Sequence, residues 1–112
     1  METKIALAKL SALAQENRLA LFRLLVKAGR EGLAAGDIAA ALGVPPNTLS
    51  AQLNILSQAG LIAGARQGRS IIYSAQYEAI SGLIVFLMED CCQGRSEICA
   101  PVLEAAQSSC CT

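Results

Sequence analysis

Three cysteines lie close together near the end of the sequence, in the stretch EDCCQGRSEIC at residues 89–99. They are Cys91, Cys92 and Cys99, and the 112-residue chain contains no histidine. Three thiolates without a nitrogen donor suit a soft, thiophilic centre. Neighbouring side chains on a helix diverge by about 100°, so Cys91 and Cys92 can bind one ion only where the helix ends and its backbone can adjust. The Gln-Gly step after the pair can reverse the chain and bring Cys99 close to it. The spacing therefore predicts a three-thiolate site at the end of a helix.

The same thiols have an alternative use as a redox switch, which requires a lowered thiol pKa. Here Glu89 and Asp90 precede the pair, and the position at a helix C-terminus adds further negative potential. Both influences are expected to raise the pKa of the thiols, whereas a bound electrophilic ion displaces their protons. Ion binding is thus favoured over oxidation. Cys110 and Cys111, in the tail, are assigned no required role.

Length and composition predict one small helical domain. The chain is 54% hydrophobic but only 4% aromatic and has no Trp, so Ala, Leu, Ile and Val must form the core. No secretory signal is visible, and the longest uncharged apolar run, residues 83–88, is too short to span a bilayer. We therefore expect a cytoplasmic protein without a membrane partner, in which five cysteines are ligands or redox groups rather than disulfides.

The spacing of hydrophobic residues and the positions of Gly and Pro predict where the helices and strands lie. Helices are expected at residues 3–14, 17–28, 47–59 and 76–92, and two extended runs at 61–65 and 70–74. A short helix of about two turns is expected within residues 32–43, with Gly43 at its end. Thr3 is the expected first cap, Pro46 suits a first helical turn, and Gly68 suits the hairpin turn. The fold class is mainly α with a small β-hairpin, in the order α-α-α-α-β-β-α. Two short helices, the second with an uncharged polar outer face, are typical of a helix-turn-helix.

Charge is distributed unevenly although the formal net charge is zero. Residues 38–77 carry two bases, Arg66 and Arg69, and no acid, whereas residues 78–112 carry five acids against one base. The middle of the chain can therefore lie against a polyanion without repulsion.

The last predicted helix is apolar nearly all round, which requires burial on more than one side. In so small a protein, packing against a second copy, together with the apolar first helix, meets this requirement. We expect a two-fold homodimer through the first and last helices.

The order of elements, with LGVPPNTLSAQLNILSQAGLI leading into ARQGRSIIYS, resembles the ArsR/SmtB family of winged helix-turn-helix, metal- and metalloid-responsive repressors. The resemblance covers residues 5–92 and is most specific in ENRLALFRLL, PPNTLSAQL, AGLI and RQGRSIIY. It implies a DNA-binding and dimerisation domain at 1–92, an effector-binding segment and tail at 93–112, and an operator that is an imperfect palindrome. An enzyme is not expected, because there is no histidine, no phosphate-binding Gly loop and no nucleophile–base pair.

The resemblance also implies which residues meet DNA. Residues of the second helix of the helix-turn-helix enter the major groove, and the wing arginines reach the backbone or minor groove. Many relatives have a large or basic residue and a histidine where this chain has Ala51 and Gln52, and a glutamine suits adenine edges. The expected DNA-binding residues are Thr48, Ser50, Gln52, Asn54, Arg66 and Arg69.

Relatives sense their effectors at different places. An arsenic site on the first helix of the helix-turn-helix is excluded because AAGDIAAALG lacks cysteine, and zinc sites of Asp and His are excluded because His is absent. Some arsenic-responsive members carry a Cys-Cys pair and a third cysteine six or seven residues later. The resemblance thus implies an arsenite-responsive repressor released when As(III) binds Cys91, Cys92 and Cys99. A methylated trivalent arsenical, Cd or Pb, and a reactive sulfur species or oxidant remain as alternative effectors, in a site within one chain or shared by two.

Overall fold

The computed structural model describes residues 1–88, 101, 104 and 105. Its elements are α1 (Thr3–Leu13), α2 (Glu16–Ala28), β1 (Leu33–Ala34), α3 (Ala35–Leu42), α4 (Pro46–Gln58), β2 (Ile62–Gln67), β3 (Ser70–Ala75) and α5 (Tyr77–Met88). The expected mainly helical fold with a hairpin between the fourth and last helices is confirmed. The predicted last helix also included residues 89–92, which lie outside the described residues.

Glycine and proline set the helix boundaries much as the sequence indicates. Gly29 and Gly43 follow α2 and α3 with φ values of +79° and +66°, a backbone conformation that side-chain-bearing residues rarely adopt. Pro46 occupies the first turn of α4, where a missing N–H costs no helical hydrogen bond. The expected cap at Thr3 is wrong: Thr3 is the first helical residue, and Glu2 holds the cap position without a side-chain hydrogen bond.

The hairpin belongs to a three-stranded antiparallel sheet in the order β1-β3-β2. Strand β1 was not predicted, because a two-residue strand has no detectable period. It forms where Gly32, at φ +71°, brings the chain so close to the Tyr73 carbonyl oxygen that an added Cβ would clash with it. Leu33 then pairs with Tyr73, so β3 is hydrogen-bonded on both edges. The wing therefore does not depend on helix packing alone.

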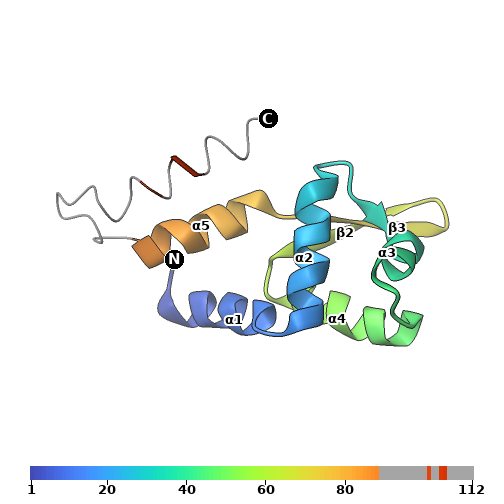
Figure 1. The fold of residues 1–112 in the computed structure, drawn as a ribbon, viewed down its shortest axis with the longest axis horizontal. Helices are drawn as coiled ribbons and strands as arrows, with labels where there is room; N and C mark the ends of the chain where they lie inside the picture. Colours follow the sequence, from blue (N-terminus) through green and yellow to red (C-terminus); the bar gives the residue numbers. More distant parts are fainter. Residues whose placement is uncertain (89–100, 102–103, 106–112) are drawn as a thin grey trace.

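The core gathers around α2, which crosses the middle of the molecule in front of the sheet (Figure 1). Leu21 and Leu25 of α2 are fully buried, and so are Ile38 of α3, Leu56 of α4 and Leu61 before β2. The helical spacing of Leu49, Leu53 and Leu56 predicts that they form the inner side of α4, and all three are buried. Figure 1 shows α1 and α5 together at one end of the molecule and the hairpin tip at the other. Among the described residues, no helix is long and apolar enough to cross a membrane.

Candidate nucleic-acid interface

Helices α3 and α4 form the helix-turn-helix, with only Gly43, Val44 and Pro45 between them. The outward side of α4 is polar and uncharged, whereas its inner side is apolar and buried. Thr48, Ser50 and Asn54 are exposed, as predicted, and so are Asn47 and Ala51. A helix with this division can rest on the core and offer short hydroxyl and amide groups to a groove.

The electrostatic potential at the first turn of α4 favours the binding of an anion. It contains no acidic residue, and the cap position is held by Pro45, which has no side-chain hydrogen bond to give. Only Thr48 N is capped locally, by a 3.0 Å hydrogen bond to Asn47 Oδ1 at the surface. The positive end of the helix dipole is thus exposed where a phosphate would approach.

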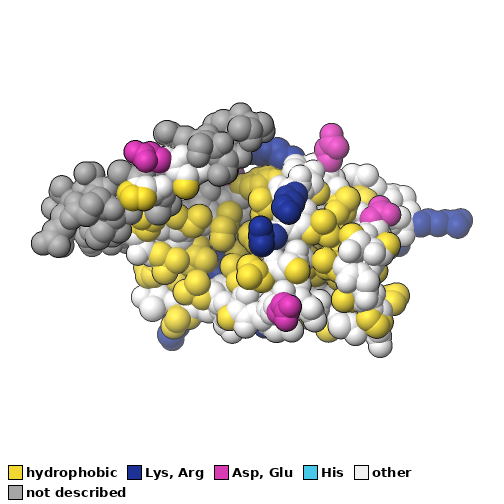
Figure 2. Space-filling view, in the orientation of Figure 1, with side chains coloured by type: hydrophobic (Ala, Val, Ile, Leu, Met, Phe, Trp, Pro, Cys, Tyr) yellow, Lys and Arg dark blue, Asp and Glu magenta, His cyan; other side chains and the backbone are white. Residues whose placement is uncertain are grey.

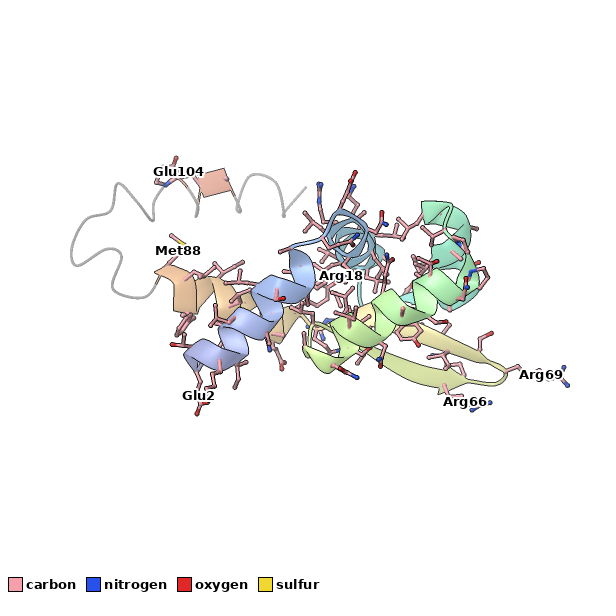
Figure 3. The ribbon with its side chains drawn as sticks, turned by 90° about the horizontal axis from the view of Figure 1, so that it is seen from below. Glu2, Arg18, Arg66, Arg69, Met88 and Glu104 are labelled. Carbon is pink, nitrogen blue, oxygen red and sulfur yellow. The ribbon has the colours of Figure 1, made fainter. Side chains whose placement is uncertain are left out.

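The wing places two guanidinium groups away from the body. Gly68 and Arg69 form a two-residue turn between the paired residues Gln67 and Ser70, and Gly68 has the positive φ of +65° that such turns require. Arg66 is exposed near the end of β2, and Figure 3 shows both arginine side chains pointing outward at the tip. Both charges of the hairpin thus lie at or next to its tip.

Helix α4 and the wing border one shared hollow. Ser50 of α4 lines it together with Arg69 and Ser70 of the wing, and Ala35 and Gly36 close it from the start of α3. Helix α4 and the wing carry no acid, whereas the exposed Asp37 follows Gly36 at the start of α3. Leu53, Ile71 and Tyr73 also line the hollow, so polar and apolar groups together join α4 to the wing.

The expected exposure of Gln52 is wrong. Its side chain is only 7% exposed, and in the part of the chain that the structure describes its Oε1 has no hydrogen-bond partner. The reason is helical spacing: Leu49, Gln52, Leu53 and Leu56 follow the i, i+3, i+4, i+7 pattern of a single buried stripe. That pattern could have identified Gln52 as an inner residue from the sequence. Gln52 is therefore not a base-reading residue in this conformation.

A second surface, at the opposite end, is apolar. Val85 and Leu87 of α5 are 66% and 53% exposed, and Leu7 of α1 is 58% exposed. Ile5 and Ile84 on the same two helices are also exposed. Figure 2 shows hydrophobic side chains at this end as well as over the middle of the molecule. Exposed apolar side chains on two adjacent helices mark a protein-interaction surface.

The predicted effector cysteines, Cys91, Cys92 and Cys99, lie outside the described residues, as do Cys110 and Cys111. The boundary proposed between residues 92 and 93 lies there too. Among the described residues, no group of three or more His, Cys, Asp or Glu side chains could hold a metal ion.

Comparisons with known proteins agree with this geometry. A helix-turn-helix domain family matches residues 13–65. The HTH-type transcriptional regulator NmtR of Mycobacterium tuberculosis is 42% identical over 66 residues, which are 58% of this chain and 52% of that protein. The chain thus spans about half the length of this curated relative.

Two solved structures extend the similarity. NolR from Sinorhizobium fredii has 31% identity and a TM-score of 0.62, covering 77% of this chain and 83% of that chain. A homodimeric winged helix-turn-helix DNA-binding domain from Mycobacterium bovis, described as a possible ArsR-family regulator, has 26% identity and a TM-score of 0.64, covering 76% and 77%. The chain belongs to the ArsR family of winged helix-turn-helix proteins.

Proposed function

We propose that the chain is a transcriptional regulator that binds operator DNA as a homodimer. The observation that carries this proposal is that the exposed side of α4 and the wing, neither of which carries an acid, border the same hollow. On it, Thr48, Ser50 and Asn54 meet base edges and phosphates in the major groove, and Arg66 and Arg69 supply counter-charge. The name of the NmtR relative, a transcriptional regulator, supports the same role and agrees with the expectation that the chain is not an enzyme.

Dimerisation follows from the apolar surface of α1 and α5. A second copy is the occupant we propose, because the relative from Mycobacterium bovis is homodimeric and because these two helices carry the most exposed apolar side chains. Two-fold symmetry then places two α4 helices on successive major grooves, about 34–36 Å apart. The matching operator is an imperfect palindrome.

The effector we propose is As(III), bound by Cys91, Cys92 and Cys99. In the sequence, Cys91 follows Met88, the last described residue of α5, by three positions. A ligand bound there would act on the helix that forms the dimer surface and so on the separation of the two α4 helices. Coupling of about 1–3 kcal/mol weakens DNA binding roughly 5- to 150-fold, enough to release the operator.

The test is arsenite titration of the full chain on double-stranded DNA that the chain itself selects from a random pool. Arsenite should release this DNA, and Cys91→Ser, Cys92→Ser and Cys99→Ser should each abolish the release without weakening DNA binding. The matched control replaces Cys110 and Cys111 together, and it should respond like the natural chain. If no palindromic DNA is selected, the regulator proposal fails.

If arsenite leaves the DNA bound, the effector assignment fails by itself. Methylarsonous acid, Cd²⁺, Pb²⁺ and hydrogen peroxide, titrated in parallel, identify which alternative effector the thiols sense. Release that persists in the three cysteine variants would place the site elsewhere in the chain.

A further inference from the structure

Lys9 of α1 is a charged side chain in an unusual position. It is only 8% exposed, and lysine is almost never buried to this extent without a partner. Its Nζ donates a 2.9 Å hydrogen bond to the carbonyl oxygen of Ala59, fifty residues away in the sequence. The ammonium thus joins two helices that the chain itself does not connect directly.

The acceptor lies at the C-terminal end of α4, the helix with the proposed DNA-reading face. The last carbonyls of a helix have no intrahelical donor and carry negative partial charge. Helix α4 has no basic residue in its own last turn, so Lys9 supplies the compensating positive charge from outside. The chain passes close by: a side-chain carbon added at Gly60 would lie 3.5 Å from Nζ. The ammonium therefore lies next to the backbone that leaves α4.

Beside this bond, α1 meets α4 through small side chains. Ala12 of α1 is buried in the core cluster that includes Leu53 and Leu56 of α4, whereas Ala8 and Ser11 line an open hollow with Ile55 and Gln58. The hydrogen bond of Lys9 is directional, and apolar contacts of small side chains are not. The bond is therefore the contact that sets the direction in which α4 meets α1.

Helix α1 also takes part in the proposed dimer surface through Ile5 and Leu7. We propose that Lys9 is a positioning residue that fixes the angle between the dimer surface and α4, and thereby the half-site spacing that the dimer accepts on DNA. This inference rests on the proposed function. The hydrogen bond from Lys9 to Ala59 connects α1, at the proposed dimer surface, to α4, at the proposed DNA surface. It involves none of the proposed DNA-contacting residues and none of the cysteines.

The test compares the natural chain with Lys9→Met, which keeps the apolar stem and loses the donor, and with Lys9→Arg, which keeps a charged donor. Lys4→Met, at an exposed position on the same helix, is the matched control. The probe is DNA selected by the natural chain, with one or two base pairs added between the half-sites. Each added pair moves them by about 3.4 Å and rotates one against the other.

The natural chain, Lys9→Arg and Lys4→Met should discriminate against the lengthened DNA. Lys9→Met should lose roughly tenfold of that discrimination, the size expected for a hydrogen bond to a charged group, while remaining dimeric. Unchanged discrimination in Lys9→Met would overturn the inference and leave the proposed function standing. Failure of the natural chain to select two-half-site DNA would overturn both.

A measurement on the natural chain covers the case in which Lys9→Met does not fold. Nitrogen-detected NMR of the lysine side chains should show slow hydrogen exchange for the Lys9 ammonium and fast exchange for that of Lys4. Equally fast exchange at both would mean that the bond to Ala59 does not hold in solution, and the inference would be wrong.

Discussion

Replacing Gln52 with leucine should stabilise the protein. The Gln52 side chain lies in the buried stripe of α4 between Leu49 and Leu53, and its Oε1 has no hydrogen-bond partner among the described residues. An unsatisfied buried acceptor costs about 1–3 kcal/mol, and Leu has a similar size without a polar atom. We therefore expect Gln52→Leu to raise the free energy of unfolding by about 1–2 kcal/mol.

Urea denaturation at a fixed protein concentration measures this change, because the stability of a dimer depends on concentration. With a slope of about 1–3 kcal/mol per molar, the midpoint should rise by roughly 0.3–2 M with no change in slope. Gln58→Leu is the matched control, since Gln58 is an exposed residue at the end of the same helix. It should leave the midpoint unchanged.

DNA binding gives the same variant a second readout. Because Gln52 is buried, Gln52→Leu should bind the selected DNA within about twofold of the natural chain. A loss of the size of one base contact, about 1–3 kcal/mol, would show that Gln52 reaches a base after all. A lowered urea midpoint would refute the reasoning on stability, because it would mean that the side-chain amide of Gln52 is hydrogen-bonded in solution.

Three further predictions concern the wing, the sheet and the dimer surface. Replacing Arg66 and Arg69 with Ala should reduce the salt slope of DNA binding by about 0.9 for each phosphate that is no longer neutralised, up to ~3.6 per dimer; an unchanged slope would remove both arginines from the interface. Gly32→Ala should destabilise the fold by about 2–4 kcal/mol in thermal unfolding, since it combines a positive φ with a clash against the Tyr73 carbonyl, and a neutral result would argue against this sheet register. Val85→Glu should give a folded monomer in sedimentation at concentrations where the natural chain is dimeric, and a dimeric variant would place the dimer surface elsewhere.

The sequence was most informative where backbone sterics act locally. Gly43 marks the end of α3, Pro46 marks the start of α4, and Gly68 marks the hairpin turn. A positive φ is strained for most residues other than glycine, and proline is tolerated in a helix only in its first turn. The exposure of Thr48 and the place of Arg66 at the wing tip followed from the same spacing. The helix-turn-helix and the exposed polar side of α4, apart from Gln52, were therefore predictable without tertiary contacts.

Contacts between distant parts of the chain were not predictable. Strand β1 exists only because the backbone at Gly32 meets Tyr73, forty-one positions later, and two residues carry no period of their own. The sequence shows Lys9 merely as a charge within an apolar helix. Its partner is a backbone carbonyl, which any residue type at position 59 would offer.

The sequence by itself determined the helices, the hairpin and their order, because turn sterics and helical periodicity depend on residue type and short spacing. Only the tertiary structure decided that Lys9 holds the end of α4 and that β1 pairs with β3 beside Tyr73. These two contacts depend on which parts of the chain fold against each other, and that is set by the balance of burial over the whole chain rather than by any local pattern.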